Sequence, residues 1–112
     1  MLPSAHRMRR STDFTTVVRA GLRTRNGSVV VHRHDAISTG PALVGLVVGK
    51  SVGGSVVRHR VSRRLRAQLA ERLAAMAPGS GLVVRALPDA ATATSHALGA
   101  DLDRALARLA KS

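Results

Sequence analysis

The sequence predicts an α+β fold, a two-layer sandwich in which helices pack on a mixed β-sheet. Short segments rich in β-branched residues alternate with segments of helical periodicity, and turn residues separate them. The expected order is helix, strand, strand, helix, strand, helix, with room for a short extra strand near 22–26. A length of 112 residues fits one domain with a modest core. We therefore expect a single domain over residues 1–112, of which residues 1–10 form a basic, flexible tail.

The first helix is expected over residues 12–20. Residues 11–13 offer an N-cap and an acidic first turn. Phe14, Val17 and Val18 then fall on one face, which predicts that this face packs against the sheet.

Three strands are expected at residues 28–34, 42–50 and 81–87. Each segment is rich in β-branched residues and is bounded by turn residues or by proline. The segment at 42–50 is apolar on both faces, so we expect it in the centre of the sheet.

Two amphipathic helices complete the fold. Ser55 can cap a long helix over residues 56–76. Apolar residues repeat along it every four positions, namely Val57, Val61, Leu65, Leu69 and Leu73. A last helix is marked in the same way by Leu98, Leu102, Leu106 and Leu109. Both helices are therefore expected to bury one stripe against the sheet.

Charge indicates the class of partner. The chain holds 18 Lys and Arg against 6 Asp and Glu, a formal net charge of +12, so a polyanion is expected. Residues 1–72 hold 14 basic and 3 acidic side chains, whereas residues 73–112 hold 4 and 3. We therefore expect the first two thirds to bind the polyanion and the last third to be structural.

Composition excludes several classes of protein. Phe14 is the only aromatic residue, which excludes RNA-binding modules that stack bases on two or three surface aromatics. The absence of Cys excludes disulfide frameworks and Cys-based zinc sites. No apolar run is long enough to span a bilayer, so we expect a cytoplasmic protein without a membrane partner.

Residues 50–66 form the strongest candidate site, with six positive charges and no acid. A Gly-Gly turn there could let a phosphate approach bare backbone, and a basic helix follows it. The side chains of His59, Arg60, Arg63 and Arg66 project away from the apolar stripe, and Arg58 lies in the first turn. The alternative is a solvated basic helix face that binds nothing.

Catalytic and metal-binding sets are not evident. Residues 45–51 are similar to a nucleotide-binding P-loop but are one residue too short, and their middle residues belong to a strand. His32 and His34 could share a strand face and bind a metal, with only Asp35 nearby as a further ligand. We therefore expect no catalytic residues, no metal site and no small-molecule substrate in the chain itself.

The segment 50–66 resembles the signature of the protein subunit of bacterial ribonuclease P. In that family a strand ends in a lysine, a Gly-Asn turn follows, and a helix opens with Arg-Asn-Arg and further basic residues. The matching positions are Lys50, Gly53, Arg58, Arg60, Arg63 and Arg66. Residues 9–14, followed by Gly21, resemble the opening helix of the family.

The chain departs from the family pattern at several positions. Gly54 replaces the Asn of the turn, Ser51 replaces a second lysine, and His59 replaces the Asn of Arg-Asn-Arg. Val18 and His32 stand where the family has aromatic residues.

The resemblance implies a subunit that assists a catalytic RNA in removing the 5′ leader of precursor tRNA by Mg²⁺-dependent hydrolysis. The RNA subunit, not the protein, would use the Mg²⁺. The family implies that Lys50, Gly53, Arg58, His59, Arg60, Arg63 and Arg66 bind the catalytic RNA. It further implies a leader-binding cleft with Phe14, Val18 and His32, and a left-handed crossover around the long helix. The polypeptide alone would not be catalytic.

Other functions stay open on the sequence alone. A ribosomal or other structural RNA-binding protein without a role in tRNA maturation is one alternative, and a DNA-binding protein is another. The RNA that co-purifies from cells would separate them, because it would be one long non-ribosomal species for ribonuclease P and ribosomal RNA for a ribosomal protein.

Overall fold

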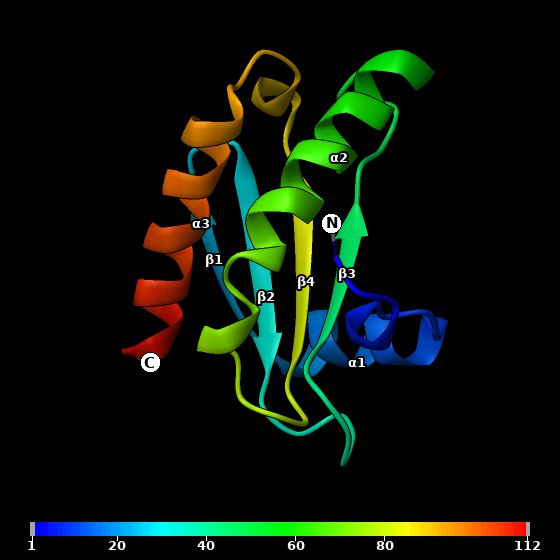
Figure 1. The fold of residues 1–112 in the computed structure, drawn as a ribbon, viewed down its shortest axis with the longest axis vertical. Helices are drawn as coiled ribbons and strands as arrows, with labels where there is room; N and C mark the ends of the chain where they lie inside the picture. Colours follow the sequence, from blue (N-terminus) through cyan, green and yellow to red (C-terminus); the bar gives the residue numbers. More distant parts are fainter. Residues whose placement is uncertain (1, 112) are drawn as a thin grey trace.

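The computed structural model describes residues 2–111 and confirms the predicted order of elements, including the extra strand (Figure 1). The elements are η1 (Ser4–His6), α1 (Ser11–Ala20), β1 (Leu22–Asn26), β2 (Val29–His34), β3 (Leu43–Val47), α2 (Ser55–Ala70), η2 (Leu73–Ala75), β4 (Gly81–Ala86), η3 (Pro88–Ala91) and α3 (Ser95–Ala110), where η denotes a 3-10 helix.

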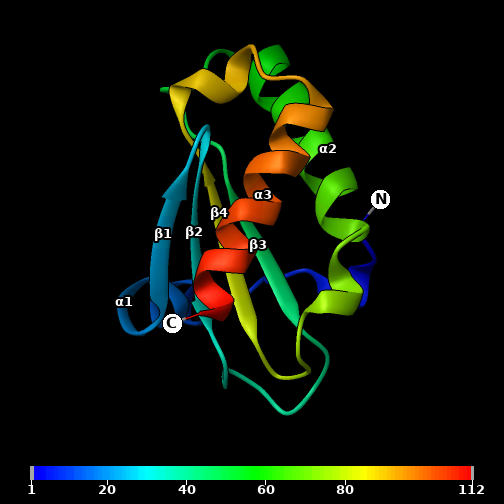
Figure 2. The ribbon, with the colours of Figure 1, turned by 90° about the vertical axis from the view of Figure 1, so that its left-hand side faces the viewer.

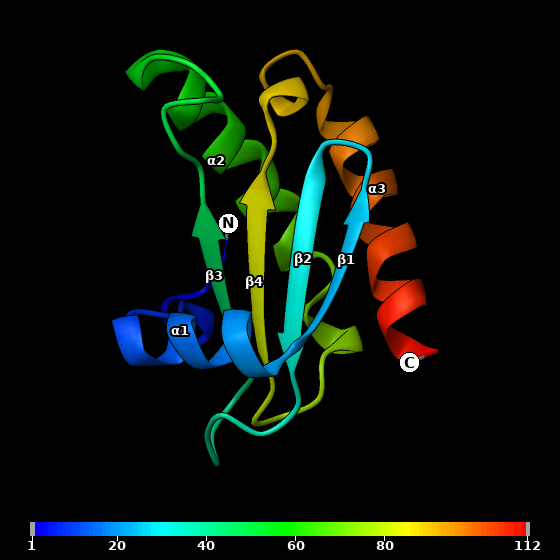
Figure 3. The ribbon, with the colours of Figure 1, turned by 180° about the vertical axis from the view of Figure 1, so that it is seen from behind.

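The strands form one mixed sheet in the order β1-β2-β4-β3. β2 pairs antiparallel with both β1 and β4, and β3 pairs parallel with β4. Seen edge-on, α2 and α3 lie together on one side of the sheet and α1 on the other (Figure 2). From behind, α1 lies across one end of its face and leaves the strands beyond it uncovered by any helix (Figure 3).

The connection from β3 through α2 to β4 is left-handed. In Figure 1 both strands point upward and α2 lies in front of the sheet. The chain leaves β3, passes through α2 and enters β4, which lies to the left of β3. Parallel β–α–β units almost always turn the other way. The handedness implied by the family resemblance is therefore present in this fold.

The expected central position of β3 is wrong, because β3 lies at the edge of the sheet. Its two faces are nevertheless covered. Val44 is buried in the core below the long helices, and Gly45 lies against the Phe14 ring on the α1 side. An apolar strand thus does not need two neighbouring strands when helices cover part of each of its faces.

The N-terminal segment differs from the expected flexible tail over its described part, residues 2–10. Leu2 and Met8 are buried, with 2% and 6% of their surface exposed. The Met8 amide donates to the Val44 carbonyl at 2.8 Å, and a His6 ring nitrogen lies 2.8 Å from the Ala42 carbonyl oxygen. Burial of two apolar side chains fixes this segment along the free edge of β3.

The predicted stripe of α2 is confirmed, with Val61, Leu65 and Leu69 fully buried in the main core. The helix ends at Ala70, however, earlier than expected. The Arg72 guanidinium donates to the Gln68 carbonyl at 2.8 Å, while the Arg72 amide bonds to the Leu69 carbonyl. The side chain of Arg72 therefore takes a carbonyl that the continuing helix would need.

Candidate nucleic-acid interface

The first candidate surface is the outer side of α2, which we call the α2 basic face. Ser55, Arg58, His59, Ser62 and Arg66 surround a hollow of about 410 Å³. His59 also borders a neighbouring hollow together with Ser55, Val56 and Arg63. The α2 basic face, made of these seven residues, thus brings together Arg58, His59, Arg63 and Arg66 of the predicted set. Guanidinium, imidazole and hydroxyl groups all donate hydrogen bonds, and no acid lines either hollow.

The remaining α2 arginines are partly used inside the protein. Arg60 donates to the Ala91 carbonyl at 2.8 Å, and Arg64 donates to the Ala93 carbonyl at 2.8 Å. Both bonds tie α2 to the segment around η3. Arg60 was expected on the RNA-binding face. It is half-buried, and one of its N–H groups is already used in a hydrogen bond within the protein. The structure places Arg60 and Arg64 beside η3, away from the hollow of Arg58 and Arg66.

The turn before α2 positions this helix. Val52 is buried and anchors the turn in the main core, and the Gly53 amide donates to the Lys50 carbonyl at 3.2 Å. Gly53 has φ +154, and a Cβ there would come within 2.9 Å of the Val57 side chain, so the position requires glycine. Lys50 is exposed at this turn, beside the start of α2.

The second candidate surface is the sheet face that α1 leaves open. Every second residue of a strand points to this face. The register places Arg23 opposite His32 and Val30 opposite Arg85. They surround the sheet hollow, a depression of about 370 Å³ lined by Val18, Arg23, Val30, His32, Val47, Val83 and Arg85. Its floor is apolar, and its charged groups are cationic.

His32 lies deep in this surface. Its side chain is 7% exposed, and its Nδ1 atom is buried without a hydrogen-bond partner among residues 2–111. Burial lowers the pKa of His32 below its ordinary value of 6.5, and the positive charges of Arg23 and Arg85 lower it further. Burial and the two arginines therefore both favour the neutral imidazole.

The predicted cleft residues do not all meet in one hollow. Val18 and His32 line the sheet hollow together. Phe14 lies with Arg7, Arg9, Gly45 and Arg66 in a separate depression of about 260 Å³ next to β3, which we call the Phe14 hollow. The ring fits there because a Cβ on Gly45 would collide with it. Arg66 borders both this depression and the α2 basic face, so the two surfaces adjoin.

Several basic residues of these surfaces were not found by reasoning from the sequence. Arg23 and Arg85 line the sheet hollow, and Arg7 and Arg9 line the Phe14 hollow. The alternation of Arg23 and Arg25 with polar residues in β1 was a usable signal for a basic sheet face. Arg85 lies in the third of the chain expected to be structural, and only strand pairing brings it beside His32.

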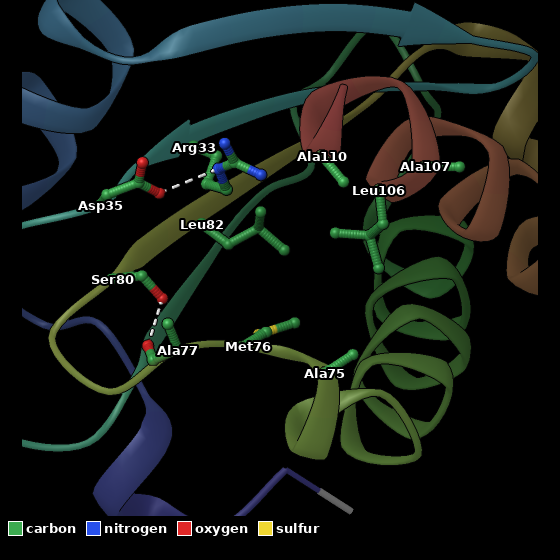
Figure 4. A pocket seen from close by; sticks show the side chains of 10 residues that line it. All are labelled: Arg33, Asp35, Ala75, Met76, Ala77, Ser80, Leu82, Leu106, Ala107 and Ala110. Carbon is green, nitrogen blue, oxygen red and sulfur yellow. Dashed lines mark hydrogen bonds and ion pairs between the residues drawn. The ribbon is translucent and has the colours of Figure 1, made fainter. Parts of the chain in front are cut away.

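A hollow on the other side of the sheet has a different character. It measures about 360 Å³, and Met76, Leu82 and Leu106 point into it (Figure 4). Arg33 at its border is paired with Asp35 at 3.1 Å, so its charge is already balanced. This hollow thus differs from the two candidate surfaces, whose arginines form no ion pair with another described residue.

Metal ligands do not cluster in the described part of the chain. No three His, Asp or Glu side chains among residues 2–111 come close enough to hold an ion. None of the helices described is long and apolar enough to cross a membrane.

The fold and the two basic surfaces define a small nucleic-acid-binding protein of the α+β class. The family model described as Ribonuclease P matches residues 2–110, and the chain belongs to this family. Its role is accordingly that of the protein subunit of ribonuclease P, an RNA-binding subunit of the ribonucleoprotein endonuclease that processes tRNA.

Similar proteins agree with this assignment. The ribonuclease P protein component of Mycobacterium sp. (strain KMS) is 51% identical over 110 residues, which cover 96% of this chain and 92% of the relative. That of Streptomyces bikiniensis is 47% identical over 117 residues, covering 97% and 95%.

Solved structures agree on the fold. The RNase P protein of Staphylococcus aureus has a TM-score of 0.80 at 21% identity, with 94% of this chain and 95% of that chain covered. The RNase P protein of Thermotoga maritima has a TM-score of 0.75 at 19% identity, with 95% and 96% covered.

Proposed function

We propose that the chain binds two RNA partners through its two surfaces. The α2 basic face binds the catalytic RNA of ribonuclease P, and the sheet hollow receives the 5′ leader of precursor tRNA. The observation that carries this proposal is the collection of arginines, without an ion pair among residues 2–111, around two hollows that no acid lines. Such surfaces favour a polyanion and repel no phosphate.

The α2 basic face suits a folded RNA. Arg58 and Arg66 stand on one side of a helix at a hollow that also offers the hydroxyls of Ser55 and Ser62. Folded RNA presents phosphates and 2′-hydroxyls on its outside, and both accept hydrogen bonds from such donors. The contact therefore depends on RNA shape more than on base sequence.

The sheet hollow suits a single strand. Its valine floor can contact bases and riboses, while Arg23 and Arg85 at its borders can each bind a phosphate. No aromatic side chain lines the hollow, so a base gains little stacking there. The grip on the leader then depends mainly on the two arginines and on shape, which suits leaders of varied sequence.

The protein contributes charge and shape to the reaction. We place the Mg²⁺ ions of the hydrolysis on the RNA, because the chain's own residues offer no cluster of ligands among the described positions. Neutralising phosphates of both RNAs lowers their mutual repulsion, so the subunit should reduce the Mg²⁺ concentration needed for cleavage.

Cleavage of a precursor tRNA by a ribonuclease P RNA, with and without the chain, tests this proposal. We expect the chain to restore cleavage at a low Mg²⁺ concentration at which the RNA alone is inactive. RNA-free protein should produce no mature 5′ end. Failure of the chain to change the Mg²⁺ requirement, together with ribosomal RNA as its co-purifying partner, would instead indicate a ribosomal RNA-binding protein.

A further inference from the structure

His32 is a buried titratable group that the proposed contacts do not yet use. It lines the sheet hollow, directly opposite Arg23 of β1. With 7% of its surface exposed, it is too deep to be an ordinary surface histidine. A buried ionisable group in a concave, charged site is a candidate functional residue.

The surroundings of His32 contain positive charge and no negative charge. β1 contributes Arg23, β4 contributes Arg85, β3 contributes Val47 and α1 contributes Val18 to the same hollow. No carboxylate lines it, and the buried Nδ1 atom has no acceptor among the described residues. The free protein therefore supplies neither an opposite charge nor a hydrogen bond that would stabilise an imidazolium ring.

A bound phosphate would supply both. The ring contributes to the wall of the hollow while Nδ1 is turned into the protein, so its other edge, which carries Nε2, is the one that can meet a ligand. A phosphate oxygen beside Nε2 is an acceptor and carries the negative charge that the hollow lacks. Arg23 and Arg85 flank this position and would hold the same phosphate or its neighbours.

We propose that a leader phosphate binds in the sheet hollow between Arg23, His32 and Arg85, and that His32 takes up one proton from solvent as the phosphate binds. This inference rests on the proposed function, because it assumes that the leader occupies the hollow. It makes His32 a specificity-determining residue that favours precursor tRNA over mature tRNA more strongly as the pH falls.

The direction of the effect follows from proton linkage. When the bound state holds one more proton than the free state, affinity rises as the pH falls between the two pKa values. The leader-dependent part of the affinity should therefore strengthen about three- to tenfold from about pH 8 to about pH 6, since one pKa unit corresponds to a factor of ten.

The test compares dissociation constants of the reconstituted holoenzyme for precursor and mature tRNA across that pH range, at fixed salt and Mg²⁺. The dissociation constant for mature tRNA divided by that for precursor tRNA isolates the leader and cancels the titration of the RNA subunit. We expect the ratio to rise at low pH for the unaltered chain and to stay level for His32→Gln, whose amide cannot titrate. His96→Gln is the matched control, because His96 is exposed on α3, on the other side of the sheet.

Each outcome decides a different point. Parallel profiles for the unaltered chain and His32→Gln, with a ratio above one, would overturn the proton uptake and leave the leader site standing. A ratio of one at every pH would overturn the leader site as well. If His32→Gln does not fold, NMR of the histidine rings decides the point. The His32 resonance must then titrate at a higher pH in the complex with precursor tRNA than in the free protein, and an unmoved titration would overturn the proposal.

Discussion

The Asp101 carboxylate on α3 accepts a hydrogen bond from the Ser28 amide of the β1–β2 turn at 3.0 Å. The preceding residue, Gly27, has φ +53, and a Cβ there would collide with the carboxylate. Asp101 is 8% exposed and also pairs with Arg104 at 3.2 Å. The last helix is thus joined to the hairpin that carries Arg23 and His32, so α3 helps to position the open sheet face.

Replacing Asp101 should weaken the whole fold. Asp101→Ala leaves the buried Ser28 amide without an acceptor, and we expect the free energy of unfolding to fall by about 1–3 kcal/mol. Urea denaturation followed by circular dichroism measures this change. Asp89→Ala, at an exposed acid of η3, is the control and should change the stability little. Equal losses for both variants would show that the Asp101–Ser28 bond does not stabilise the hairpin.

Two adjacent arginines of α2 should separate RNA binding from stability. Arg63 is exposed. Arg63→Ala should make the negative slope of log affinity against log salt for the catalytic RNA shallower by about 0.7–0.9, without changing stability. Arg64 donates to the Ala93 carbonyl, so Arg64→Ala should instead cost about 0.5–1.5 kcal/mol of stability and leave the slope nearly unchanged. Salt titrations and urea denaturation of both variants check this. The reverse pattern would place Arg64, not Arg63, on the RNA.

Phe14 combines packing with the contact to the leader that the family resemblance implies. Its ring packs with Met8, Val17 and Val83 and borders the Phe14 hollow. Phe14→Ala should therefore destabilise the protein, by up to about 3 kcal/mol because the ring is only partly buried.

Phe14→Leu is the sharper variant, since leucine retains most of the packing and removes the ring. We expect it to reduce affinity for precursor tRNA and to leave affinity for mature tRNA unchanged, because only the precursor carries a leader. Binding assays with both RNAs measure the difference. An equal change for both would show that Phe14 serves packing alone.

His32 should also make stability depend on pH. Its pKa in the folded protein is lowered below 6.5 by burial and by Arg23 and Arg85, so the unfolded chain binds more protons at acid pH. The free energy of unfolding should therefore fall as the pH drops from about 7 toward the lowered pKa. In His32→Leu this component should vanish, whereas His96→Gln should retain it. Urea denaturation across this range measures the profiles, and identical profiles for the His32 variant and the unaltered chain would contradict the prediction.

Local sequence patterns determined the elements and the α2 basic face. The four-residue repeat of Val61, Leu65 and Leu69 sets which side of α2 is buried, and the opposite side must then carry Arg63 and Arg66. Periodicity within one helix is a property of neighbouring residues, so it can be read without knowing the fold. The net charge of +12 likewise requires no tertiary structure to indicate a polyanionic partner.

Tertiary structure alone decided which distant residues meet. The pattern of β3 predicts a central strand, but β3 lies at the edge, where the main core buries Val44 and Phe14 packs on Gly45. The N-terminal segment, expected to be a flexible basic tail, is packed on the protein because Leu2 and Met8 are buried. The sheet hollow exists because β1, β2 and β4 pair in a register that sets Arg23 and Arg85 around His32. Strand pairing joins segments far apart in the chain, and the left-handed crossover runs against the general preference, so no local pattern specifies either one.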